Sequence, residues 1–359
     1  MTTGVATSDA RAIGRWLALW AAAVALLVLI GGATRLTESG LSITEWKPLT
    51  GVVPPLSTHA WEEEFGRYQR IPQYQQLHAD MTLARFKAIF LWEYTHRLWA
   101  RLVGVAFALP LVWFALRRRV PAAVLPRLAV LLALLGLQGA MGWWMVQSGL
   151  SVRTSVSQYR LAAHLMMALF LYAAAVWTAA GLLEHRPAPG QALRPAFGAM
   201  LALTALVFLT ALSGAFVAGL HAGKIYNSVP FMGAGLVPAE YLQLSPAWRN
   251  VFENPAAAQF DHRVLATLTF LAAIAAGLVF WRASNARLGR RARWLVGAAL
   301  LQVALGIATL LWSVPIVLGV AHQAGAVLLL TAAILALHAT PRGAPPTAAP
   351  ASPSSTRRS

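Results

Sequence analysis

Eight long apolar runs constrain the fold of this chain more than any other feature of its sequence. Each run approaches the ~20 residues that a helix needs to cross a bilayer. The runs are approximately Trp16–Ala33, Ile89–Leu116, Leu128–Val146, Leu161–Leu183, Phe197–Ala218, Phe260–Trp281, Trp294–Trp312 and Ile316–His338. Hydrophobic residues make up 58% of the 359 positions and charged residues only 11%, against about 25% charged in soluble proteins. The sequence therefore predicts an all-α integral membrane protein with eight transmembrane helices.

Clusters of basic residues in the gaps between the runs predict the orientation of these helices. Cytoplasmic loops retain an excess of Lys and Arg. The clusters are Arg11 and Arg15; Arg117, Arg118, Arg119 and Arg127; Arg186 and Arg194; Arg282, Arg287, Arg290, Arg291 and Arg293; and Arg357 and Arg358. With eight helices they all fall on one side, so both termini are expected in the cytoplasm. The clusters account for much of the net charge of +17, and we expect no nucleic-acid partner.

The other side of the membrane receives the longest loop, residues 34–88. Its stretch AWEEEFGRYQRIPQYQQL predicts one amphipathic helix lying at the membrane surface. Residues 1–15 are expected to form a cytoplasmic N-terminus. Residues 341–359 are rich in Pro, Ala, Ser and Arg and are expected to form a disordered cytoplasmic tail.

An internal repeat indicates that the first apolar run is a membrane helix rather than a cleaved signal peptide, which is the alternative interpretation. IGGATRLTESGL after the first run pairs with LSGAFVAGLHAGK after the fifth, and EYTHRLWARLVG in the second run pairs with QFDHRVLATLTF in the sixth. LLGLQGAMGWW in the third run resembles ALLQVALGIATLLW in the seventh. The sequence thus predicts two repeated four-helix bundles, residues 16–190 and 191–340.

Four histidines lie near the starts of the four runs that enter from the loop side: His96, His164, His262 and His322. They are expected at one depth, toward the outer leaflet, with two from each bundle. A lone membrane histidine is more often a hydrogen-bonded core residue, but the pairing by repeat favours ligands. Two facing imidazoles in a four-helix bundle suit haem iron. Zinc and copper also accept imidazole, although their usual third and fourth ligands are not evident.

Ionisable residues accompany the histidines. Glu93 precedes His96 by three residues and so shares its helix face, and an intramembrane carboxylate suggests a functional site. Gln259 stands at the matching place before His262, which suggests two haem sites of which only the first performs chemistry that needs an acid. The alternative is a Glu93–Arg97 helix ion pair. Arg97 and Arg263 each follow a histidine and would either neutralise haem propionates or extend to the interface.

The sequence resembles the haem A synthase family, of the bacterial and mitochondrial type, from Leu29 to about Leu337. The resemblance is carried by GGATRLTESGLSITEWKPLTGVVPP, WEEEFGRYQRIPQYQ, DMTLARFKAIFLWEYTHRLWARLVG, SGAFVAGLHAGKIYNSVPFM and the ExxH formed by Glu93 and His96. It implies that His262 and His322 bind haem b and that the substrate, haem O, binds at His96 and His164. Because the chain contains no cysteine, it is similar to the cysteine-free branch.

The resemblance also implies a reaction and a location. The C8 methyl group of haem O becomes a formyl group through a hydroxylated intermediate, giving haem A for cytochrome c oxidase, in the cell inner membrane. Glu93 would relay protons if activated oxygen hydroxylates the methyl group. It would act as base or cation stabiliser if water attacks an oxidised macrocycle. Candidate partners are haem O synthase, an electron-transfer partner, cytochrome oxidase assembly factors and a second copy of the chain.

Two other functions compete with this interpretation. A di-haem b-type membrane electron carrier would bind haem in both bundles without substrate chemistry, and Glu93 would then be dispensable. A transporter would place its binding site near the midplane, which the outer depth of the histidines disfavours.

Overall fold

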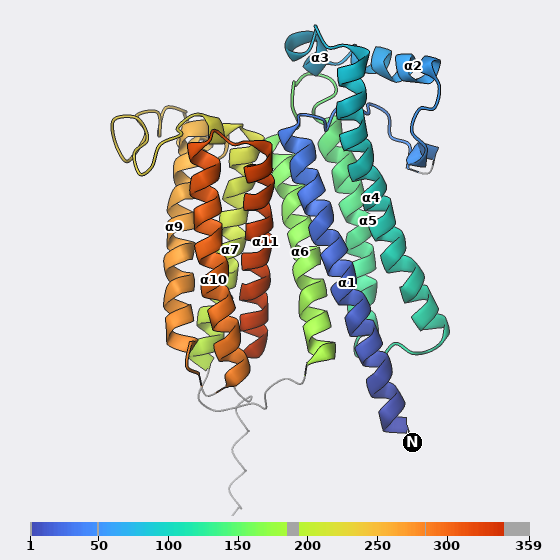
Figure 1. Cartoon of the computed structure of the whole chain (residues 1–359), viewed down its shortest axis with the longest axis vertical. Coiled ribbons are helices and arrows are strands. Elements are labelled where there is room, and N and C mark those ends of the chain that lie inside the picture. Colours follow the sequence, from blue (N-terminus) through green and yellow to red (C-terminus); the bar gives the residue numbers. More distant parts are fainter. Residues whose placement is uncertain (1, 49, 185–193, 284, 341–359) are drawn as a thin grey trace, which may run out of the picture.

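Eight helices long and apolar enough to cross a membrane dominate the computed structural model, which describes residues 2–48, 50–184, 194–283 and 285–340 (Figure 1). They are α1 (Thr2–Leu36), α4 (Leu83–Leu116), α5 (Leu125–Gln147), α6 (Gln158–Leu183), α7 (Arg194–Gly219), α9 (Pro255–Phe280), α10 (Ala286–Leu311) and α11 (Ile316–Ala339). The predicted class, an all-α membrane protein with eight spanning helices, is confirmed. The tail predicted as disordered, residues 341–359, lies outside the described residues.

Seven of these eight helices begin before the apolar run that predicted them. Three starts are stabilised by side-chain caps that accept hydrogen bonds from free backbone N–H groups. Thr82 caps α4, Asn254 caps α9 and Asn285 caps α10. A hydropathy pattern reports the part of a helix that lipid can surround, so it misses such capped polar turns.

The spanning helices form two groups that Figure 1 shows side by side. In the N-terminal helix group, α1 packs on α4 and α6, and α5 packs on α6. In the C-terminal helix group, α7, α9, α10 and α11 pack in a ring, and α6 and α11 join the groups. That the two groups arose from a repeat stays a prediction. So does the assignment of a different haem site to each group.

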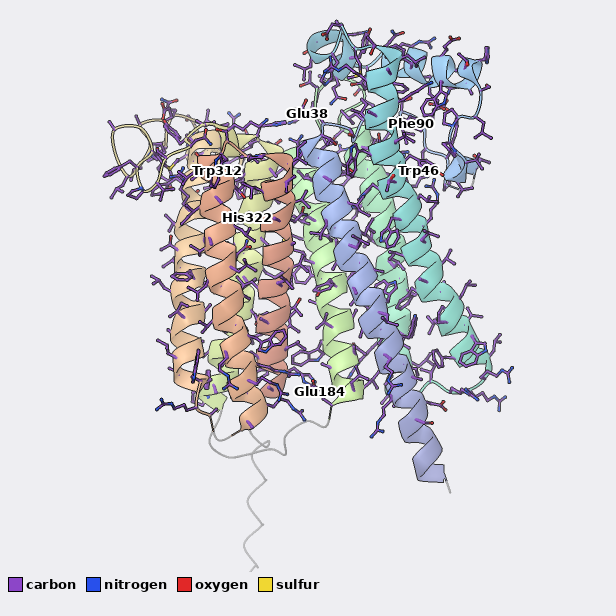
Figure 2. The ribbon with its side chains drawn as sticks, in the orientation of Figure 1. Glu38, Trp46, Phe90, Glu184, Trp312 and His322 are labelled. Atoms are coloured by element: carbon purple, nitrogen blue, oxygen red, sulfur yellow. The ribbon has the colours of Figure 1, made fainter. Side chains whose placement is uncertain are left out.

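Polar contacts join the two groups at both ends of their interface. At the upper end in Figure 1, Nη2 of Arg35 on α1 donates to the Ala218 carbonyl of α7 at 2.9 Å and lies 2.7 Å from Nε2 of His221. At the lower end, Arg291 of α10 donates to the carboxylate of Glu184, which follows α6 (Figure 2). Hydrogen bonds to charged groups contribute about 1.5–3 kcal/mol each, so both contacts matter for how the groups are held together.

Two short helices, α2 (Thr58–Tyr68) and α3 (Pro72–Leu77), cap the upper end of the N-terminal helix group (Figure 1). The prediction of one continuous amphipathic helix here is wrong. Pro72 occupies the first turn of α3, and Ile71 before it is extended, with φ −90° and ψ 154°. A proline inside a helix removes an N–H donor and clashes with the preceding turn, whereas at a helix start it is well tolerated.

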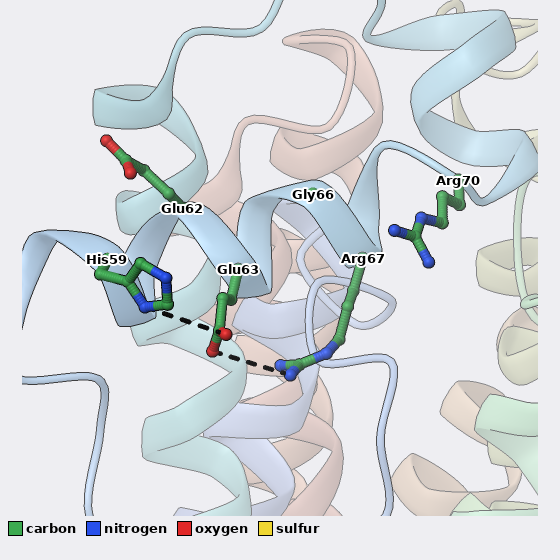
Figure 3. Close-up of a pocket in the computed structure, with 6 residues that line it drawn as sticks. All are labelled: His59, Glu62, Glu63, Gly66, Arg67 and Arg70. Atoms are coloured by element: carbon green, nitrogen blue, oxygen red, sulfur yellow. Dashed lines mark ion pairs between the residues drawn. The ribbon is translucent and has the colours of Figure 1, made fainter.

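The outward face of α2 carries a hollow lined by charged residues. Figure 3 shows His59, Glu63 and Arg67 on successive turns, with nitrogen–oxygen distances of 3.8 Å and 3.9 Å for the two pairs. Exposed pairs of this spacing contribute only about 0.3–0.5 kcal/mol. This face is a solvated helix surface, and its charged residues are explained by their ion pairs without a bound ligand.

Candidate functional site

Each of the four predicted histidines packs its ring against a glycine of the spanning helix before it. A Cβ built on the glycine would lie 2.9–3.1 Å from the imidazole Cε1. The pairs are Gly31–His96, Gly142–His164, Gly214–His262 and Gly306–His322. Approaches this close leave no room for a side chain, so the glycines let each ring lie against the neighbouring backbone. Sequence reasoning missed these glycines, although each lies in a segment that the repeat had aligned.

The second histidine pair faces across the C-terminal helix group. The ring centroids of His262 and His322 lie 6.5 Å apart and the rings are nearly perpendicular, at 89°. Two imidazoles on opposite sides of one metal ion would have centroids about 6.2–6.4 Å apart, because each metal–nitrogen bond is about 2.0–2.1 Å and the ring centre lies about 1.1 Å behind the nitrogen. The spacing fits a pair of axial haem ligands.

Ser213 fixes the orientation of His262. Its hydroxyl donates to the Thr210 carbonyl at 2.8 Å and lies 2.8 Å from Nδ1 of the imidazole. With the hydroxyl proton on the Thr210 carbonyl, the hydroxyl oxygen can accept from Nδ1–H, and in this tautomer Nε2 is free for a metal. A hydrogen bond to the far ring nitrogen is the usual support of a metal-binding histidine. Ser213 is a site residue that sequence reasoning missed.

The first histidine pair is held differently. Nδ1 of His96 is buried without a hydrogen-bond partner among the described residues, whereas the Gln138 amide nitrogen lies 3.2 Å from Nδ1 of His164. Ile30 precedes Gly31 at the place where Ser213 precedes Gly214, so His96 has no matching hydroxyl. Nδ1 of His322 is likewise buried without a partner among the described residues, so in each pair one ring has a polar side chain at Nδ1 and the other has none.

An axial haem pair needs only two protein ligands, and the ring spacing of His262 and His322 fits such a pair. In the described ranges, no three residues among His, Asp and Glu gather into a site for a bare metal ion. Each of the four histidines is only partly buried. The donor sets suit haem better than a zinc or copper ion.

Glu93 is almost fully buried, with 2% of its surface exposed, and both carboxylate oxygens are occupied. Oε2 accepts from the Ser42 hydroxyl at 2.7 Å and the Ile43 backbone N–H at 2.8 Å. Oε1 accepts from Nε and Nη2 of Arg97 at 3.0 Å and 2.6 Å. His96 is not among these four donors. Glu93 thus forms the ion pair with Arg97 that was the alternative interpretation. It also binds two residues of the loop after α1, Ser42 and Ile43.

Arg97 and Arg263 both bind backbone carbonyls of the loop that follows the first helix of their group. Arg97 donates to Ile43 at 2.7 Å, and Arg263 donates to Tyr226 at 2.8 Å. Gln259, the counterpart of Glu93, also donates to the Tyr226 carbonyl, at 3.0 Å. Nε of Arg263 is buried without a partner in the part of the chain that the structure describes. The predicted pairing of either arginine with a haem propionate stays a prediction.

Comparison with known proteins covers nearly the whole chain. Residues 14–334 match a family model described as "Cytochrome oxidase assembly protein" (COX15-CtaA). A "Heme A synthase" from Parvibaculum lavamentivorans is 47% identical over 330 residues, which cover 91% of this chain and 94% of that protein. Proteins of the same name from Rhodospirillum centenum and Rhodopseudomonas palustris are 51% and 49% identical, covering 91% and 94% of this chain and 88% and 93% of their own lengths.

Proposed function

The chain belongs to the family of cytochrome oxidase assembly proteins, and from this premise we propose that it is a haem A synthase. Its substrate is haem O, whose C8 methyl group it oxidises to a formyl group through a hydroxylated intermediate. The observation that carries the proposal is 47–51% identity to proteins named "Heme A synthase" over about nine tenths of the chain. The two histidine pairs supply sites suited to a substrate haem and a resident one.

The C-terminal helix group is assigned haem b, held by His262 and His322. A haem in this position supplies one-electron redox chemistry. Ser213 keeps the His262 ring in one tautomer, and Gly214 and Gly306 let both rings approach the neighbouring helices. The spacing of the two rings supports a permanent cofactor site.

The N-terminal helix group is assigned the substrate, with His96 and His164 on the iron of haem O. Glu93 provides a buried carboxyl group three residues before His96 on the same helix. Each of its two oxygens already accepts two hydrogen bonds. Glu93 is therefore better suited to stabilise developing positive charge than to abstract a proton. Arg97 holds that carboxylate in place and offers positive charge to a propionate.

A di-haem b-type electron carrier is the second candidate function. It is favoured by one observation, that Glu93 has a complete set of protein partners and needs no substrate to explain its burial. In that case both groups would bind haem b and neither would change it.

The functions are separated by the haem that the protein makes. We expect cells that supply haem O but lack haem A to accumulate haem A when they express this chain. Haem extracted from the cells is identified by mass and absorption spectrum, because the methyl-to-formyl change alters both. Haem O left unchanged beside a purified protein that carries b-type haem would contradict the synthase and support the electron carrier.

The protein is assigned to the cell inner membrane, with both termini in the cytoplasm. The basic residues of the α4–α5 connection and of the start of α10 lie at the lower end in Figure 1, with the N-terminus, and such clusters stay cytoplasmic. A reporter fused after Thr340 should therefore report a cytoplasmic location. A reporter inserted between Trp61 and Tyr74 should report the opposite side of the membrane. Equal activity at both places would contradict this topology. Haem O synthase, an electron-transfer partner, oxidase assembly factors and a second copy are the proposed partners.

A further inference from the structure

A segment of the loop after α1 lies along the membrane helix α4 and is bound to it through its backbone. We call residues 42–48 and 50–53 the strap. Three α4 side chains donate hydrogen bonds to five strap carbonyls. Tyr94 donates to Val52 at 2.7 Å, and Arg97 donates to Ile43 at 2.7 Å and Glu45 at 3.1 Å. Arg101 donates to Lys47 at 2.7 Å and to Pro48 at 2.9 Å.

The strap lies at the depth of the membrane interface. The residues that bind it are inside the spanning helix Leu83–Leu116. Figure 2 shows Trp46 of the strap at about the same height as Trp312, which follows the last residue of α10. Exposed tryptophans at helix ends mark the boundary between lipid and water, and Trp46 and Trp312 are 49% and 66% exposed.

The bonding of the strap suits an apolar surrounding. Hydrocarbon offers no water to an irregular backbone, so such a segment is tolerated at membrane depth only where protein groups bind its polar atoms. Arg97 and Arg101 meet this requirement for four strap carbonyls. An irregular loop in water would not need two membrane arginines for this purpose.

The outer surface of the strap carries exposed apolar side chains beside one ion pair, whose Lys47 and Glu45 side chains are each 43% exposed. Trp46, Val52 and Val53 are 49%, 45% and 59% exposed. The strap charges are paired: Lys47 lies 2.5 Å from Glu45, and the hydrogen bond from Lys47 lowers the pKa of the Glu45 carboxyl. The apolar surface continues along α4 through its own exposed residues, Leu91, Trp92, Leu102 and Val105.

We propose that the strap is a lipid-binding element, whose apolar side chains insert into the bilayer leaflet on the α2–α3 side. The occupant of this surface is the lipid boundary itself, because the surface is continuous with the lipid-exposed face of a spanning helix. Interfacial elements of this kind insert about 5–10 Å into the region between headgroups and acyl chains. This role is independent of which haem the protein binds.

The absence of cysteine from the chain makes a direct test possible. A nitroxide is attached to the single cysteine of Val53→Cys, in full-length protein in phosphatidylcholine vesicles. Power-saturation electron paramagnetic resonance then compares collisions with oxygen, which concentrates in lipid, and with a water-soluble nickel chelate. Leu19→Cys on α1, where Leu19 is 74% exposed, is the lipid control, and Glu62→Cys on α2 is the water control.

We expect the label at Val53 to collide several-fold more with oxygen than with nickel, as at Leu19, while the label at Glu62 shows the reverse. Arg101→Gln in the Val53→Cys background should raise the nickel accessibility, because two of the five carbonyl contacts are lost. The haem spectrum of this double variant checks that the bundle is intact. A Val53 label that behaves like the Glu62 label would overturn the proposal. So would a label shielded from both reagents, which would indicate a protein cover.

Discussion

Glu93→Gln should stop the conversion of haem O, or stall it at the hydroxylated intermediate, while haem b stays in place. The amide has one oxygen and one NH2 group, so it cannot accept hydrogen bonds from both Arg97 and the Ser42–Ile43 corner, and it carries no charge. Loss of several kcal/mol of transition-state stabilisation lowers turnover about a hundredfold or more. The measurement is haem extraction from cells that express each variant beside a haem O source.

Two controls separate charge from architecture. Gln259→Glu adds a carboxylate at the matching place in the C-terminal helix group, and we expect no second active site because the substrate is assigned to the other group. Arg101 binds the strap but is not among the residues that bind Glu93. Arg101→Gln should therefore loosen the strap and keep haem A formation. Normal haem A from Glu93→Gln would show that this glutamate is structural, a member of the Arg97 ion pair and nothing more.

His262→Leu and His322→Leu should each remove or alter the low-spin b-type haem of the purified protein. Either change deletes one of two axial nitrogens, and leucine offers no replacement ligand. The absorption spectrum and the haem content per chain measure the loss. His96→Leu is the matched control, which should keep the low-spin signal of the C-terminal site. An unchanged low-spin spectrum in both the His262 and His322 variants would contradict the assignment.

Ser213 provides a graded version of the same test. Ser213→Ala removes the acceptor of the His262 Nδ1–H, and the loss of such a support lowers metal-site affinity about 10–100-fold. Ser213→Thr keeps a hydroxyl and should keep the haem. The haem dissociation rate and the midpoint potential are the readouts, because a residue that only packs would leave the potential unchanged. Equal haem retention and potential in the alanine and threonine variants would show that the hydroxyl does not matter.

The membrane helices could be predicted because their signal is local. A run of apolar residues identifies a spanning segment whatever it packs against, and Arg and Trp mark its ends. The break between α2 and α3 was also local, and Pro72 at a helix start could have revealed it. The four predicted histidines come from four helices, and each contacts a glycine. The repeat aligned the segments that contain these glycines, but it did not predict the contacts.

Other site features depend on contacts between distant residues. Glu93 is 51 positions from Ser42 and 50 from Ile43, and no spacing rule connects a helix residue to a particular loop amide. Ser213 is 49 positions from His262. The ionisable residues of α4 suggested a site because charge in a membrane is costly. The structure gives Arg97 and Arg101 a second use, which is binding the strap.

Arg35 and Glu184 fasten the two helix groups at opposite ends of one interface, and this sets a limit on how the protein can move. A clamshell motion between the groups would have to break a charge-assisted contact in every cycle, at a cost of about 1.5–3 kcal/mol for each hydrogen bond. The two contacts therefore oppose a hinge motion between the groups. A haem that arrives from the membrane would pass between helices of a single group. The two histidine pairs would keep a constant separation, so that electrons cross the same distance at each turnover.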